Sequence, residues 1–195
     1  MDILTIGLGT IGTTYSYLFN KAGHNVEHYI RKSSKKINIT ELNVDMLDGR
    51  NNKKGDHYTD TYKVNTHTKD NYDFIFISMP AGNIESIIET LNSNNIKGTI
   101  ILCCGIWEDK KYLEKVMQGR KYILGYPVAG GNIVDATLTC CVFDHFILEK
   151  KENSKIDNYD KLVKLFESCN IKLETPYDML EWIWLHMAIN AGVVS

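Results

Sequence analysis

The stretch DILTIGLGTIG, residues 2–12, decides the fold of this chain. Its first five residues predict a buried parallel strand, and residues 10–22 carry apolar side chains at helical spacing. Between them, Gly7 would permit a tight turn, Gly9 would let the backbone approach a pyrophosphate, and Gly12 would let the helix pack close to the strand. Phosphates would then lie at the helix N-terminus. The residues expected to contact a nucleotide here are Gly7, Leu8, Gly9, Thr10, Ile11 and Gly12.

The end of the second predicted strand indicates which nucleotide binds. Residues 25–30 predict that strand, and the basic stretch RKSSKK, residues 31–36, follows it. Roughly 20 to 25 residues beyond the first glycine, NAD-binding domains normally carry Asp or Glu facing the ribose, whereas this chain has Arg31. Glu27 lies inside the strand rather than at its tip. Arg31 and Lys32 suit a 2′-phosphate, which favours NADP(H), although a solvated basic loop is the alternative.

Length and composition limit the possible functions. The chain has 195 residues, 44% of them hydrophobic, and a formal charge of −2, which suits one domain or slightly more. This charge gives no electrostatic support for a nucleic-acid partner. No apolar stretch is long enough to span a membrane, and the N-terminus lacks the features of a signal peptide. We therefore expect a cytoplasmic enzyme with no nucleic-acid or membrane partner.

The cysteines do not predict a metal site. There are five, and none is spaced like the CxxC pairs of metal centres. Most are expected to be small core residues with reduced thiols. Cys104 is the exception, because it precedes Gly105 at the end of a predicted strand, on the edge where ligands bind.

The remaining pattern predicts an α/β fold, a Rossmann-type mostly parallel sheet with flanking helices. Strands at 72–78, 99–103 and 122–128 alternate with helices at 83–91 and 109–117, the first beginning at a possible Asn83 cap. Two further β-like runs are predicted at 135–142 and 146–150. Residues 37–66 indicate an irregular or hairpin insertion.

The last part of the chain changes character. A helix at 158–168 and a short strand at 171–174 are followed by an almost wholly apolar helix over 179–194, with Pro176 expected in its first turn. We expect a nucleotide-binding domain over 1–175, and over 176–195 the first helix of a truncated or absent helical C-terminal domain.

Two polar residues interrupt this apolar helix. His186 and Asn190 are four residues apart and therefore share one helical face. A buried polar pair costs stability unless it is hydrogen-bonded, which favours a functional role. The alternative is that His186 is a core histidine bonded to a backbone carbonyl.

The glycine turn, the sequence AGH at 22–24, Arg31 and the sequence WLHMAIN at 184–190 together resemble the N-terminal NADP-binding domain of ketopantoate reductase-like (2-dehydropantoate 2-reductase) proteins. The resemblance covers essentially the whole chain. It implies reduction of a 2-keto acid to a 2-hydroxy acid with NADPH, and a helical domain beyond this segment. The cofactor contacts that it implies outside the glycine turn and the basic stretch are Met79, Pro80, Cys104, Gly105 and Gly131.

The resemblance also implies catalytic positions. The family's acid lysine falls on His186, and a substrate-binding asparagine falls on Asn190. The family's cofactor lysine falls on Pro80, and the Asn of its Asn-Gly pair falls on Cys104, so neither of these polar contacts is kept.

The chemistry tolerates the change from lysine to His186. Hydride addition to a ketone builds negative charge on oxygen, and an imidazolium can stabilise that charge and then donate a proton. Because the polar contacts expected at Pro80 and Cys104 are absent, a second function is an alternative: a catalytically degenerate module that binds or senses NADPH without turnover. A methyltransferase using S-adenosylmethionine is a third alternative, disfavoured by Arg31 because that ligand has no 2′-phosphate. The apolar terminal helix further predicts a homodimer.

Overall fold

The computed structural model describes residues 1–80 and 82–193. The strands are β1 (Asp2–Ile6), β2 (Asn25–Tyr29), β3 (Glu41–Asp48), β4 (Asp56–Lys63), β5 (Asn71–Met79), β6 (Lys97–Cys104), β7 (Tyr122–Val134), β8 (Thr137–Leu148) and β9 (Lys172–Glu174). The helices are α1 (Thr10–Lys21), α2 (Ile84–Ser93), α3 (Lys110–Met117), α4 (Tyr159–Ser168) and α5 (Met179–Val193). The predicted α/β fold is confirmed.

The strands of the described residues form one sheet. Their order is β2-β1-β5-β6-β7-β8-β3-β4, with β9 paired to β8. The first five strands of this order are parallel, which is the Rossmann-type part of the prediction. β8 then turns back antiparallel to β7, and the β3–β4 hairpin extends the sheet from β8. The hairpin expected within residues 37–66 is therefore present and belongs to the main sheet.

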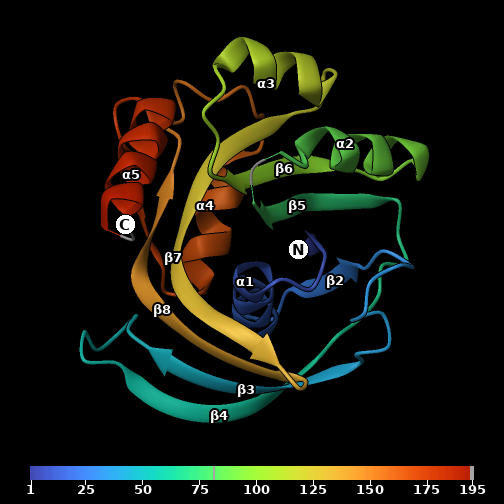
Figure 1. Ribbon diagram of the computed structural model, residues 1–195, viewed down its shortest axis with the longest axis vertical. Helices are drawn as coiled ribbons and strands as arrows, with labels where there is room; N and C mark the ends of the chain where they lie inside the picture. Colours follow the sequence, from blue (N-terminus) through green and yellow to red (C-terminus); the bar gives the residue numbers. More distant parts are fainter. Residues whose placement is uncertain (81, 194–195) are drawn as a thin grey trace.

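The sheet curves around α1, which lies inside it (Figure 1). Tyr15 and Phe19 of α1 are fully buried, and both rings pack against Phe76 of β5, with centroids 5.5 and 6.0 Å away. The Tyr15 ring also meets the edge of Phe146 on β8, at 5.4 Å. Because strands surround the helix on several sides, α1 buries polar residues as well as apolar ones. Among these, Ser16 donates to the carbonyl of Gly12 and is hydrogen-bonded to Thr5.

The opposite face of the sheet is covered by α2, α3 and α5. Phe74 and Phe76 of β5 point into the core around α1, whereas Ile75 and Ile77 point into the core beneath these three helices. Both faces of β5 are therefore buried, as its near-continuous apolar sequence predicts.

The β7–β8 hairpin differs from the prediction. The runs at 135–142 and 146–150 were expected to be separate strands, but β8 is continuous from Thr137 to Leu148. β7 extends to Val134, and the chain reverses at Asp135 and Ala136, whose φ values of 46° and 58° suit a two-residue hairpin turn. Neither residue is a glycine, so the turn carried little signal in the sequence.

Two helix starts also differ in detail. Asn83 occupies the N-cap position of α2, but its side chain makes no capping hydrogen bond. α5 begins at Met179, so Pro176 lies before the helix rather than in its first turn. Asp178 caps α5 instead, since its carboxylate accepts from the backbone N–H groups of Leu180 and Glu181. The proposed boundary between two domains at residue 175 stays a prediction. In this structure α5 packs on the same sheet as the other helices.

Gly131 is required by the close pairing of β7 and β8. Its φ is +145°, and a Cβ at this position would lie 2.1 Å from the carbonyl oxygen of Thr139. We expect Gly131→Ala to lower the free energy of unfolding by about 3 kcal/mol, measured by urea denaturation. Gly130→Ala is the matched control, because its Cβ would meet only Cys141 Sγ at 3.6 Å. Equal stability of the two variants would contradict this explanation.

Candidate functional site

The glycine turn adopts the geometry that its three glycines predict. Gly7 has φ +81°, and its N–H donates to the carbonyl of Tyr29, which ties the turn to the end of β2. A Cβ at Gly12 would lie 3.0 Å from Thr5 Cγ2, so this glycine allows α1 to approach β1 closely. Apart from its chain neighbours, no heavy atom of the described residues lies within 4 Å of the Cβ position of Gly9, which leaves its backbone open to a ligand. The turn leads directly into the N-terminus of α1.

The buried side chain of His28 is hydrogen-bonded to this turn from the interior of the protein. His28 Nδ1 lies 2.9 Å from the carbonyl oxygen of Gly7, and Nε2 lies 2.9 Å from the hydroxyl of Tyr62 on β4. A carbonyl only accepts, so Nδ1 carries the proton and Nε2 accepts from Tyr62. Burial lowers the pKa of His28 to about 4. The neutral imidazole therefore links the β3–β4 hairpin to the glycine turn at neutral pH.

A groove of about 420 Å³ opens beside the turn at the carboxyl edge of the parallel strands. Its floor comes from the ends of β1, β2 and β5, and α2 forms one wall. Of the residues predicted to contact a cofactor, the groove is lined by Gly7, Leu8, Gly9, Arg31, Met79 and Pro80. Six residues from three separate segments of the sequence are thus brought to one place.

The groove also has polar lining that the sequence interpretation did not assign. Ser34 and Lys36 join Arg31 from the basic stretch, and the ammonium of Lys36 donates to the carbonyl of Leu8 at 2.9 Å. On the α2 side, Ser86 and Thr90 face the same space. Ser34 and Lys36 could have been found in the basic stretch itself. The α2 residues carried no signal, because only the packing of α2 brings them to the groove.

Glu27 is excluded as a ribose ligand. It is buried in β2, where its carboxylate accepts from the Tyr72 hydroxyl at 2.6 Å and from the N–H and hydroxyl of Thr68. These hydrogen bonds keep the pKa of Glu27 below its usual value despite its burial. The acidic residue of this strand therefore has a structural role, and Arg31 lies at the strand tip.

The other predicted cofactor residues lie outside the groove lining. Thr10, Ile11 and Gly12 form the first turn of α1, and Lys32 is exposed. Cys104 is buried, which raises the pKa of its thiol to about 12. Gly131 lies in the β7–β8 hairpin, near its turn.

Gly105 connects the groove edge with the terminal helix. It directly follows β6, whose last residue, Cys104, pairs with Met79 of β5. A Cβ at Gly105 would lie 3.2 Å from the sulfur of Met187 on α5. The helix that carries His186 therefore lies over the end of β6, next to the strand whose end lines the groove.

His186 and Asn190 share a face, as predicted, and that face meets Tyr126 of β7. The expectation of a buried pair is wrong, because His186 is half-buried and Asn190 is exposed. The imidazole of His186 stacks on Trp182 at 4.9 Å with an interplanar angle of 10°, and meets the Tyr126 ring at 4.6 Å. Burial raises the pKa of Tyr126, and a hydrogen bond with the Asn190 side chain partly offsets this rise. The neighbours of the His186 imidazole are thus aromatic rings. Within the described part of the chain, His186 has no hydrogen bond to a backbone carbonyl, which is the bond that the core-histidine alternative requires. Only the tertiary structure identifies Tyr126 as the third member of this cluster.

The described residues contain no group of three or more His, Cys, Asp or Glu side chains placed to hold a metal ion. Nor does any helix among residues 1–80 and 82–193 have the length and apolar character needed to cross a membrane.

The parallel strands, the glycine turn and the groove at their carboxyl edge define a Rossmann-like α/β domain with a candidate nucleotide site. The family model of ketopantoate reductase PanE/ApbA matches residues 3–130. The chain belongs to this family. A search of curated proteins found no significant match.

Solved structures share the fold at low sequence identity. The 2-dehydropantoate 2-reductase of Methylococcus capsulatus is 16% identical, with a TM-score of 0.68 over 98% of this chain and 62% of that one. The enzyme of Geobacter metallireducens GS-15 is 15% identical, with a TM-score of 0.71 over 97% and 62%. A D-mandelate dehydrogenase solved with NADH and anilino(oxo)acetate is 15% identical, with a TM-score of 0.70 over 97% and 61%. The chain thus spans less than two thirds of each relative.

The neutrality of His28 predicts a pH dependence of stability. Its ordinary pKa of 6.5 falls to about 4 in the folded protein. Below pH 6.5 the unfolded chain binds a proton that the folded protein accepts only near pH 4. Stability that is present above pH 6.5 is therefore lost as the pH falls toward 4, and between about pH 7 and pH 5 this loss is about 2 kcal/mol.

Urea denaturation at the two pH values measures this loss. In His28→Gln the fall in stability between them should shrink by about 2 kcal/mol relative to the unsubstituted protein. His57→Gln, at a largely exposed position beside Asp45, is the control and should leave the fall unchanged. An unchanged fall in His28→Gln would show that His28 is not buried in its neutral form.

Proposed function

We propose that this protein binds NADP(H) in the groove beside Gly7 to Gly9 and reduces a 2-keto acid to a 2-hydroxy acid. The observation that carries the proposal is the position of Arg31, with Ser34 and Lys36, in the groove at the tip of β2. A 2′-phosphate there would meet guanidinium, ammonium and hydroxyl donors. Glu27 supports the same choice of cofactor, because its carboxylate is already hydrogen-bonded to Tyr72 and Thr68. Among the described residues, the groove lining contains no carboxylate that could receive a ribose 2′-hydroxyl.

The shape of the turn fits the pyrophosphate of such a cofactor. The open backbone at Gly9 and the N-terminus of α1 offer N–H donors to an anion. When bound, NADPH supplies the hydride for the reaction. Gly105 and Met79, at adjacent strand ends, would lie between the groove and α5, where the substrate is expected.

The face of α5 supplies the groups that a carbonyl reduction needs. Protonated His186 would stabilise the negative charge that develops on the carbonyl oxygen, and would then transfer its proton to the alkoxide. Stacking on Trp182 restricts the orientation of the imidazole. Asn190 and the Tyr126 hydroxyl would donate hydrogen bonds to the substrate carboxylate.

A specific observation also favours a second candidate, binding or sensing of NADPH without turnover. Pro80 lines the groove but has no side-chain or backbone donor, and Cys104 is buried with a protonated thiol. Two positions where the resembled family has polar cofactor contacts are therefore apolar here. Cofactor binding and catalysis must accordingly be measured separately.

The cofactor proposal predicts a selective effect of Arg31. Replacing it with alanine should weaken NADPH binding at least about tenfold, and should leave NADH affinity within about twofold, because only NADPH carries the 2′-phosphate. Fluorescence titration of both cofactors measures this. Lys35→Ala is the matched control, because Lys35 belongs to the same basic stretch but is exposed and outside the groove lining. Equal loss for both cofactors would refute 2′-phosphate recognition by Arg31.

The catalytic proposal predicts that His186→Ala lowers kcat by about 10²-fold or more in NADPH oxidation with a panel of 2-keto acids. NADPH affinity should remain unchanged, because His186 lies outside the groove lining. The full-length gene product should be used, and His145→Gln on β8 serves as control. An active enzyme that tolerates His186→Ala would refute its role as the acid. NADPH binding with no turnover of any acid by the unsubstituted protein would favour the sensing alternative.

We propose further that the outer face of α5 forms a homodimer contact. Leu185 and Ile189 are 63% and 54% exposed on this helix, whereas Ile183 is fully buried. Apolar side chains on both sides of one helix favour a second covering surface. Light scattering of residues 1–195 should therefore give a dimer, and Leu185→Glu should give a monomer. A monomer in the unsubstituted chain would contradict the proposal.

A further inference from the structure

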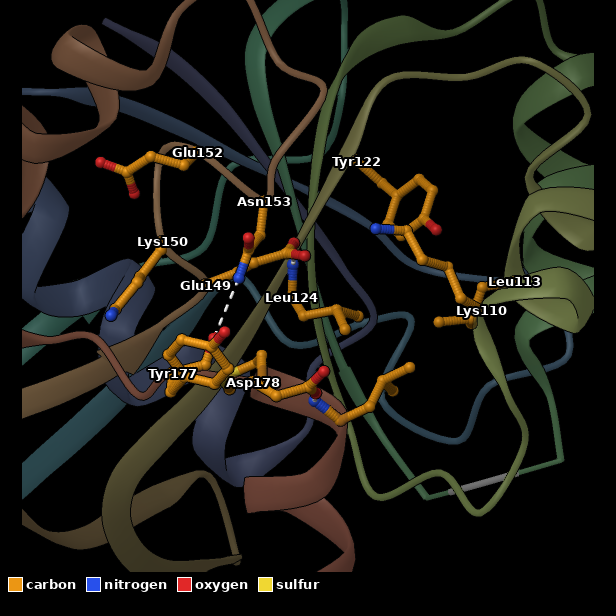
Figure 2. Close-up of a pocket in the computed structure, with 12 residues that line it drawn as sticks. Lys110, Leu113, Tyr122, Leu124, Glu149, Lys150, Glu152, Asn153, Tyr177 and Asp178 are labelled. Atoms are coloured by element: carbon orange, nitrogen blue, oxygen red, sulfur yellow. Dashed lines mark hydrogen bonds between the residues drawn. The ribbon is translucent and has the colours of Figure 1, made fainter.

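A second cavity lies between α3 and the start of α5, away from the glycine turn (Figure 2). It has a volume of about 480 Å³, and none of its lining residues lines the nucleotide groove. Its apolar lining comes from Leu113 of α3, Leu124 of β7 and Met179 of α5. The function proposed above makes no use of this cavity.

Glu149 carries a buried carboxylate into this cavity. The residue directly follows β8 and is only 8% exposed. One carboxylate oxygen accepts from the N–H of Leu124 at 3.2 Å, and the Glu149 N–H donates to the Leu124 carbonyl. Within the described part of the chain, the second carboxylate oxygen has no hydrogen-bond donor, and burial raises the pKa of this group. A buried carboxylate that is only half hydrogen-bonded favours a cationic partner.

Lys110 contributes the opposite charge from the α3 side of the same cavity. Figure 2 shows its side chain across the space from Glu149. The ammonium of Lys110 acts to lower the pKa of Glu149, yet the two groups form no ion pair among the described residues. Asp178, which also lines the cavity, is already engaged as the cap of α5. Lys150, which lies over the Tyr177 ring, and the exposed Glu152 also line the cavity. Glu149 is the buried charge among these residues, and Lys110 is the cation whose charge acts on it.

We propose that this cavity binds a free α-amino acid with an apolar side chain. The ammonium of the ligand would pair with Glu149, its carboxylate would pair with Lys110, and its side chain would lie on Leu113, Leu124 and Met179. A simple amine would leave Lys110 without a partner, and a simple carboxylate would leave Glu149 half satisfied. A zwitterion can pair with both groups at once, because its ammonium and its carboxylate are attached to the same carbon and point in different directions.

Isothermal titration of residues 1–195 with L-leucine tests this site, with N-acetyl-leucine and leucinamide as matched probes. Each probe lacks one of the two charges and should bind at least about tenfold more weakly than leucine. Equal binding of either probe, or no binding of leucine at millimolar concentration, would overturn the proposal.

Two variants test the two charges within the protein. Glu149→Gln keeps an acceptor for the Leu124 N–H but removes the charge, and Lys110→Gln changes an exposed position where folding is not at risk. Each should weaken leucine binding at least about tenfold, whereas Glu152→Gln, at an exposed position on the rim, should not. Wild-type affinity in Lys110→Gln would overturn the proposal even if Glu149→Gln failed to fold. NADPH titration in parallel keeps this result separate from the nucleotide groove.

Discussion

The enclosure of α1 by the curved sheet is the constraint on which the rest of this structure depends (Figure 1). Phe76 and Phe146 reach the helix from β5 and β8, which are not adjacent strands of the sheet. The close approach of Gly12 to Thr5 sets the distance between the helix and β1. Because a short turn joins the end of β1 to α1, the N-terminus of the helix lies at the carboxyl edge of the parallel strands. The position of the groove follows from this placement.

The β3–β4 hairpin, which the sequence predicts only as an irregular or hairpin insertion, supports the same site. It closes the curve of the sheet beyond β8, and its Tyr62 hydroxyl donates to His28 beneath the Gly7 carbonyl. The polar backbone of the turn is thus satisfied from inside the protein, while the open side of Gly9 remains available. The architecture separates the structural hydrogen bonds of the turn from those that a ligand would use.

The predictions from local pattern were reliable where one segment determines its own geometry. Strand β1, the glycine turn, α1 and the shared face of His186 and Asn190 all follow from short-range periodicity. The predictions were incomplete where distant segments meet. The turn at Asp135 and Ala136 lacks glycine, and its position depends on the pairing of two long strands. Trp182 lies four residues before His186 on α5, so helical spacing brings these two rings together. No spacing along the chain indicates that Tyr126 of β7 meets them.

The sequence by itself determined the class of fold, the location of the glycine turn and the basic stretch beside it, because these depend on chain-local spacing and backbone freedom. Only the tertiary structure decided which polar residues reach the groove and which do not. Lys36 lies at the groove, where its ammonium donates to the Leu8 carbonyl. Cys104 is instead part of the core, because it lies on a buried strand. The same packing creates the cavity around Glu149, since that space exists only where α3 and α5 leave the sheet uncovered between them.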